Sequence, residues 1–139
     1  MRSRHVAANR PIARPISPHL SVFKWRFTMA VSIIHRATGT ALAFGGGVLF
    51  LWWLLAAASG PDAYATFYTV ARGPIGILVG VGLSWVFFQH LLSGLRHLYM
   101  DTGAGYGLAE ARSSAVAVFA GAVLLTVLLW VAILSTKGL

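Results

Sequence analysis

The sequence predicts an all-α integral membrane protein with three transmembrane helices, preceded by an irregular basic arm. Of its 139 residues, 58% are hydrophobic and only 10% are charged, whereas a soluble domain carries about 25% charged residues. Three apolar stretches are long enough to cross a hydrocarbon core of ~30 Å. The chain has no cysteine, so it holds no disulfide, thiolate-ligated cluster or thioether-attached cofactor.

The basic arm covers residues 1–27 and the transmembrane domain covers residues 28–139. Most of the net charge of +8 lies in the arm, which holds Arg2, Arg4, Arg10, Arg14, Lys24 and Arg26. Pro11, Pro15 and Pro18 prevent a long helix there, because proline lacks the amide donor. The arm has no continuous apolar core, so it is not a secretory signal, although its arginines also suit an organelle transit peptide.

The three transmembrane helices are expected at about residues 28–58, 75–99 and 113–135. At ~1.5 Å per residue the first is about 46 Å long and the second roughly 37 Å. The last contains the segment 115–134, which has no ionisable group. Glycine and proline residues near positions 59–62, 72–74 and 103–107 mark the predicted loops.

The distribution of Lys and Arg predicts the orientation of the chain. The arm and the second loop together hold eight of these residues, whereas the first loop and the tail hold only Arg72 and Lys137. We therefore expect the N-terminus in the cytoplasm, or in the matrix if the protein is mitochondrial.

Two polar clusters lie within the predicted spans, where an ionisable residue costs several kcal/mol and is a candidate for function. The first helix carries Ser32, His35, Arg36 and Gly39. The second helix carries His90, Ser93, Gly94 and His97. In each cluster the spacing i, i+3, i+4, i+7 places all four residues on one face. Both clusters lie toward the cytoplasmic side, where they could face one another.

His90 is the candidate metal ligand. It lies nine residues before Tyr99, or about 14 Å of helix, so it is deep in the hydrocarbon. Ligation of a haem iron by neutral imidazole is favoured there over a hydrogen bond to a neighbouring helix. Gly94, one turn away, leaves room for a flat macrocycle. His97 lies nearer the surface beside Arg96 and is expected to serve an anionic group or the interface.

Arg36 and Ser32 are the candidate quinone-binding residues. The guanidinium of Arg36 suits carboxylates such as haem propionates, or a carbonyl oxygen, although an arginine here could instead snorkel to the surface. The Ser32 hydroxyl can donate to a quinone oxygen, whereas an isolated helical serine usually bonds its own backbone. Together the two side chains form a small polar pocket.

Three segments carry a resemblance to a known family. They are RPISPHL at 14–20, SIIHRATG at 32–39 and HLLSGLRHLYMD at 90–101. Their order and spacing resemble the cytochrome b556 membrane-anchor subunit of succinate dehydrogenase, respiratory complex II. The last two segments are specific, whereas the third helix is generic. Because only 13 residues precede the first segment, a bacterial inner-membrane protein is expected rather than a mitochondrial precursor.

The resemblance implies roles for individual residues. His90 would be one axial ligand of haem b, and the other ligand would come from a second small membrane-anchor subunit. Ser32 and Arg36 would line a ubiquinone site near the iron–sulfur subunit, with His35 and Arg36 approaching the haem propionates. His97 belongs to the same motif with a less defined role.

The function implied is that of a membrane anchor which passes electrons from succinate oxidation to the quinone pool. Succinate oxidation itself would belong to a flavoprotein subunit, and the electron path to the iron–sulfur subunit. No nucleic acid partner is expected. Two alternatives stay open: a cytochrome b anchor of fumarate reductase or another dehydrogenase, and a haem-free membrane scaffold whose histidines bond neighbouring helices.

Overall fold

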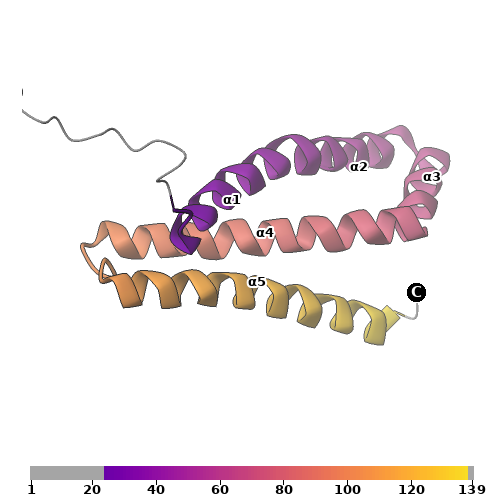
Figure 1. The fold of residues 1–139 in the computed structure, drawn as a ribbon. Helices are drawn as coiled ribbons and strands as arrows, with labels where there is room; N and C mark the ends of the chain where they lie inside the picture. Colours follow the sequence, from indigo (N-terminus) through magenta and orange to yellow (C-terminus); the bar gives the residue numbers. More distant parts are fainter. Residues whose placement is uncertain (1–23, 138–139) are drawn as a thin grey trace, which may run out of the picture.

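A computed structural model describes residues 24–137, and the part of the predicted arm at residues 1–23 lies outside them. Every element in the described part is helical (Figure 1). In chain order the elements are α1 (Phe27–Ala41), a π-helical turn (Leu42–Gly46), α2 (Gly47–Ser59), α3 (Pro61–Arg72), α4 (Pro74–Asp101) and α5 (Leu108–Lys137). The all-α prediction is confirmed.

Three of the helices are long and apolar enough to cross a membrane. They cover Phe27–Ser59, Pro74–Asp101 and Leu108–Thr136, with mean hydropathies of 1.9, 1.8 and 2.7. Most of their large apolar side chains point outward: Phe44 is 74% exposed and Leu78 is 72% exposed. Such a surface is stable only in an apolar surrounding. The prediction of three long apolar helices is therefore confirmed.

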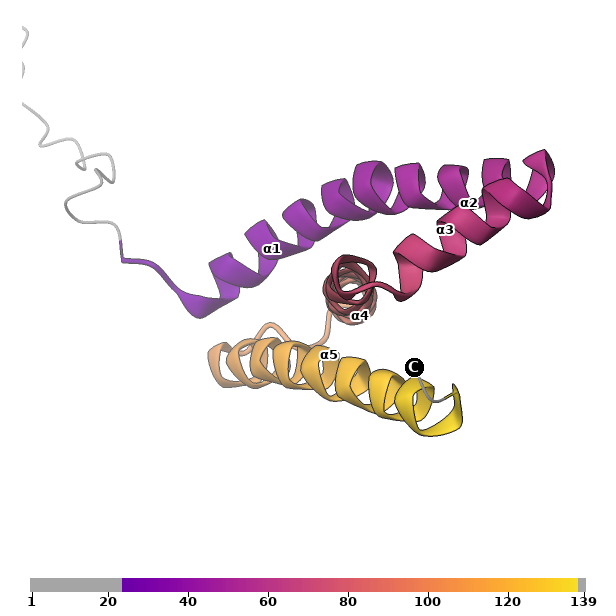
Figure 2. The same cartoon turned by 90° about the vertical axis from the view of Figure 1, so that its right-hand side faces the viewer.

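The first long helix is interrupted by the π-helical turn at Leu42–Gly46. A π turn holds one more residue than a turn of α-helix. The glycines at 45–47 have no side chains that could pack against a neighbouring helix. On the N-terminal side of the turn α1 packs on α4, whereas α2 packs on α3 instead (Figure 2). The π turn thus marks where the first span leaves the surface of α4.

Helix α3 occupies the segment at residues 59–74, where the sequence predicts a loop. Gly60 ends α2 in a backbone conformation with φ 109°, which favours glycine. Pro61 stands at the first position of α3, with Asp62 in its first turn and Arg72 in its last. These residues match the preferences of helix ends and the helix dipole. The glycine and proline signals mark helix ends here and not the bounds of a loop.

Helices α4 and α5 pack side by side and antiparallel, and polar contacts near both ends fix their register. The Trp130 indole N–H donates to Ser84 Oγ at 3.2 Å. At the other end Arg96 Nε donates to Ser114 Oγ at 2.9 Å. Interhelical hydrogen bonds of this kind supplement van der Waals packing in a membrane, where the lipid tails are as apolar as the side chains.

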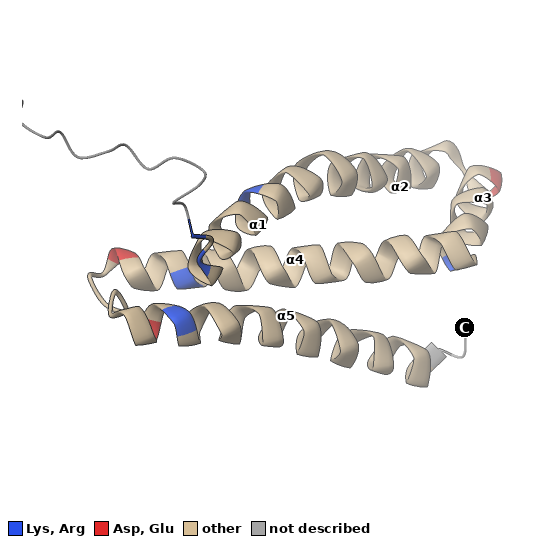
Figure 3. Cartoon of the chain, in the orientation of Figure 1, with Lys and Arg blue, Asp and Glu red and all other residues tan. Residues whose placement is uncertain are grey.

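One end of the helix bundle is strongly charged (Figure 3). There α1 begins, α4 ends and α5 begins, and this end carries Lys24, Arg26, Arg96, Asp101, Glu110 and Arg112. The opposite end carries Asp62 and Arg72 around α3. At the charged end α1 also reaches α5, where the rings of Phe27 and Phe119 have centroids 5.4 Å apart. Helices α1, α4 and α5 therefore all meet near this end.

Candidate functional site

The structure brings together the histidines of the two predicted clusters. The rings of His35 on α1 and His90 on α4 are stacked, with centroids 4.2 Å apart and planes 8° apart. The ring of His97, also on α4, lies 5.1 Å from that of His35 at an angle of 52°. The two clusters therefore face one another through their imidazoles, as their spacing predicts.

The hydrogen bonds of His90 define which ring nitrogen carries its proton. Nδ1 lies 3.1 Å from the backbone oxygen of His35 and 3.3 Å from Thr38 Oγ1. A carbonyl oxygen can only accept, so Nδ1 carries the hydrogen and donates it. Thr38 Oγ1 donates its own hydrogen to the Ile34 oxygen at 2.8 Å, which leaves it able to accept from Nδ1. The lone pair of His90 Nε2 is therefore available to a metal.

Gly39 leaves the space that the ring of His90 occupies. A Cβ atom at Gly39 would lie 2.9 Å from His90 Cε1, closer than real Cβ contacts allow. A Cβ at Gly94 would lie 3.8 Å from His35 Nε2, which is ordinary contact. Gly39 therefore allows the closer of the two approaches, and the room that Gly94 would leave for a macrocycle stays a prediction.

Thr38 is a site residue that the sequence analysis missed. It is 4% exposed, and its hydroxyl lies between the backbone of α1 and the ring of His90. Its position three residues after His35 places it on the same face of α1. That spacing could have pointed to Thr38 as a site residue. A threonine in a helix, however, commonly donates only to its own helix backbone, so the spacing alone did not single it out.

Ser32 and Arg36 lie one turn apart on the flank of α1, beside the face that carries His35. Ser32 is partly buried, and Arg36 is exposed. Within the described residues the Arg36 guanidinium has no hydrogen bond or ion pair. An exposed cation beside a hydroxyl, at the level of the histidines, can bind an acidic or carbonyl-bearing group that approaches from outside the three helices.

The described residues offer few ligands to a metal. Among the described residues no group of three or more His, Cys, Asp or Glu side chains could hold a metal ion. His90 therefore suits a metal whose other coordination positions are filled by groups outside the described residues, such as a macrocycle that takes an axial imidazole. The buried Nε2 of His35 has no hydrogen-bond partner in the described part.

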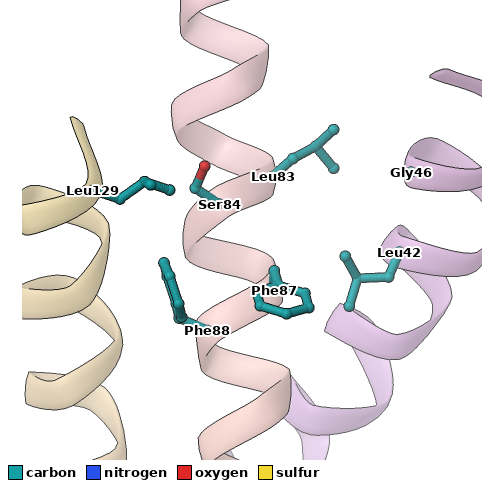
Figure 4. A pocket seen from close by; sticks show the side chains of 7 residues that line it. All are labelled: Leu42, Gly46, Leu83, Ser84, Phe87, Phe88 and Leu129. Carbon is teal, nitrogen blue, oxygen red and sulfur yellow. The ribbon is translucent and has the colours of Figure 1, made fainter. Parts of the chain in front are cut away.

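The apolar pocket beside the π turn is separate from these residues (Figure 4). It has a volume of about 350 Å³. Its lining consists of Leu42, Gly46, Leu83, Ser84, Phe87, Phe88 and Leu129. The hydroxyl of Ser84 is already engaged, since it donates to the Gly80 oxygen at 2.7 Å and accepts from Trp130. None of the five predicted site residues lines this pocket.

Comparison with known proteins agrees with the motifs. The family described as "Succinate dehydrogenase/Fumarate reductase transmembrane subunit" matches residues 10–129, which include all five predicted site residues. The succinate dehydrogenase cytochrome b556 subunit of Paracoccus denitrificans is 44% identical over 115 residues, 83% of this chain and 88% of the relative. That of Rickettsia conorii is 39% identical over 119 residues, 85% of this chain and 91% of the relative.

A mitochondrial relative shows the same pattern. The succinate dehydrogenase cytochrome b560 subunit of Bos taurus is 35% identical over 120 residues, 86% of this chain and 71% of the relative. The similarity thus extends over most of the chain in bacterial and mitochondrial proteins. The resemblance of the sequence motifs to the cytochrome b556 membrane subunit is confirmed, and the chain belongs to the family of succinate dehydrogenase/fumarate reductase transmembrane subunits.

Proposed function

We propose that this chain anchors a succinate dehydrogenase in the membrane, binds haem b through His90 and forms part of a ubiquinone site with Ser32 and Arg36. The proposed partners are a flavoprotein subunit, an iron–sulfur subunit and a second small membrane-anchor subunit. The location is the bacterial inner membrane, with the N-terminus and the charged end of the helices in the cytoplasm. The names of the relatives support this assignment.

The hydrogen bond from His90 Nδ1 to the His35 carbonyl carries the haem assignment. It favours the tautomer in which Nδ1 carries the hydrogen and Nε2 keeps its lone pair, and backbone carbonyls commonly orient metal-ligating histidines in this way. His90 would supply one axial bond, and the second anchor subunit would supply the other. Bound haem b would supply a one-electron store whose potential depends on axial ligation and burial.

The remaining polar groups of the cluster fit the edge of such a cofactor. The exposed Arg36 guanidinium would bind the haem propionates, and His35 on the same helix would lie close to them. His97 lies against the ring of His35 and would hold that ring in place.

The quinone site would lie on the outer flank of α1. Quinone reduction to quinol places negative charge on the quinone oxygens before protons arrive, and fixed donors stabilise that charge. The Ser32 hydroxyl and the Arg36 guanidinium are donors one turn apart, and Arg36 is exposed on the surface of this chain. The electrons would come from the iron–sulfur subunit, because this chain has no cysteine to ligate a cluster.

A reduced-minus-oxidised visible spectrum of the purified complex tests the haem assignment. The wild-type complex is expected to show b-type bands, and the His90→Leu complex is expected to lose them while the flavoprotein and iron–sulfur subunits copurify. His5→Leu, a histidine outside the three motifs, is the matched control and should keep the bands. A wild-type complex without b-type bands would support the haem-free scaffold instead.

A further inference from the structure

Helix α4 carries two polar side chains that are fully buried and have no partner. Gln89 and Ser93, one turn apart, are both 0% exposed. Neither the Oε1 and Nε2 atoms of Gln89 nor the Oγ atom of Ser93 has a hydrogen bond within the described residues. Gln89 is also the largest of the fully buried side chains. These three atoms lie outside the haem and quinone roles proposed above.

The face of α4 that carries these residues is turned toward α5. Gln89, Ser93 and Arg96 have the spacing i, i+4, i+7 and share one side of the helix. Arg96 donates to Ser114 Oγ at 2.9 Å and to the Ala111 oxygen at 3.2 Å, both on α5. Gln89 and Ser93 therefore belong to the contact between helices and not to the surface that meets lipid.

The opposing face of α5 carries small apolar residues that are buried. A Cβ atom at Gly121 would lie 2.9 Å from Leu92 Cδ1. Together with the Arg96–Ser114 contact, this approach sets the segment 118–122 opposite Gln89 and Ser93. Within it Val118 is 6% exposed and Ala122 is 0% exposed. These side chains are apolar, so they offer no hydrogen bond to the amide or the hydroxyl.

Burying an amide without a hydrogen bond is unfavourable, and folded proteins satisfy nearly all such groups. Because the side chains of this chain cover both residues completely, neither a lipid headgroup nor another subunit can reach them. The missing partner must be small and must both donate and accept. Water meets these conditions, and a buried water typically makes about three hydrogen bonds.

We propose that Gln89 and Ser93 bind an internal water molecule at the contact between α4 and α5, close to where α1 joins it. The water accepts from Gln89 Nε2 and donates to Gln89 Oε1 and Ser93 Oγ. The hydrogen bond between Arg96 and Ser114 lies on the same side of α4, nearer the charged end of the helices. This inference stands independently of haem or quinone binding.

A structure of the whole complex, at a resolution that shows ordered waters, tests the proposal. The wild-type map is expected to show a water density peak within hydrogen-bonding distance of Gln89 and Ser93. The Gln89→Leu/Ser93→Ala double variant is expected to lose this peak. Thr126→Val is the matched control, because Thr126 is buried on α5 and its hydroxyl bonds the Ala122 oxygen. Its map should keep the peak.

Two results would overturn the proposal. One is a wild-type map in which the Gln89 amide bonds protein groups directly and no water lies beside it. The other is a peak that persists in the double variant, which would mean that other groups hold the water. If the double variant does not assemble, the wild-type map and the single variant Ser93→Ala decide between these outcomes. In Ser93→Ala the peak should weaken or shift toward Gln89.

Discussion

The His90 ring lies flat on the His35 ring, with centroids 4.2 Å apart, and also donates from Nδ1 to the backbone oxygen of the same residue at 3.1 Å. His35 thus meets His90 through both its side chain and its main chain. A backbone oxygen is fixed by the helix, so α1 sets the orientation of an imidazole that belongs to α4. The position of α1 against α4 therefore controls which His90 nitrogen is available for ligation.

We expect Gly39→Ala to disturb this arrangement. The added methyl would lie 2.9 Å from His90 Cε1, so the ring or the helix must move, at a cost of about 1–3 kcal/mol. Haem retention in the purified complex, measured from the reduced-minus-oxidised spectrum, should fall by about tenfold. Gly82→Ala is the matched control, since no atom lies within 4 Å of its added Cβ. Equal haem content in both variants would argue against close packing at Gly39.

The histidine contact could be predicted from the sequence, because two clusters with the same helical spacing lie at the same depth in neighbouring spans. The hydrogen-bond acceptors of His90 could not be predicted in this way. The His35 backbone oxygen has no signature in the sequence, since every residue carries one. The closeness of Gly39 to His90 depends on the distance between α1 and α4, which the spacing of residues in the sequence does not encode.

Thr38→Val should weaken haem retention less than Gly39→Ala does. The substitution keeps the shape of the side chain and removes one acceptor for His90 Nδ1, while the His35 oxygen remains. Loss of one such hydrogen bond corresponds to about 0.5–1.5 kcal/mol. The measurement is the midpoint temperature of haem loss from the complex. Thr126→Val, which removes a buried hydroxyl on α5, should leave this midpoint unchanged, and an equal effect of both variants would contradict a specific role for Thr38.

Ser32→Ala and Arg36→Lys should each slow quinone reduction by on the order of 10²-fold in kcat/KM, the effect of removing one donor from a developing oxyanion. Lysine keeps the charge of Arg36 but lacks its planar fork. Succinate oxidation with a soluble dye should be unaffected, so the ratio of the two activities is the measurement. Arg72→Lys, at the opposite end of the helices, is the control. Unchanged quinone kinetics in both variants would show that Ser32 and Arg36 do not belong to the quinone site.

Arg96 and Ser114 should be coupled energetically. Arg96→Leu and Ser114→Ala each remove the hydrogen bond of 2.9 Å between α4 and α5. A double-mutant cycle on the unfolding free energy of the complex in detergent should give a coupling of about 0.6 kcal/mol, the average for interhelical hydrogen bonds in membranes. Additive effects of the two substitutions would show that this contact contributes nothing to the register of α4 and α5.

The ends of α3 could be predicted from the sequence, but its helical conformation could not. Proline and glycine residues such as Pro61 and the flanking glycines occur both in loops and at helix ends. Only the helical conformation of the residues between them distinguishes a helix from a loop. Gln89 was missed for a different reason. It adjoins His90, but its burial depends on α5, whose apolar segment gives no indication of which face it turns toward α4.

The most direct test of the central claim is imidazole rescue of the His90→Gly complex. In our account the variant lacks an axial ligand, so its reduced-minus-oxidised spectrum should lose the b-type bands. Added imidazole should restore them, because a free ring can donate to the His35 oxygen and Thr38 and present its other nitrogen to the iron. A His90→Gly complex that keeps the wild-type spectrum without imidazole would contradict the assignment of His90 as the haem ligand.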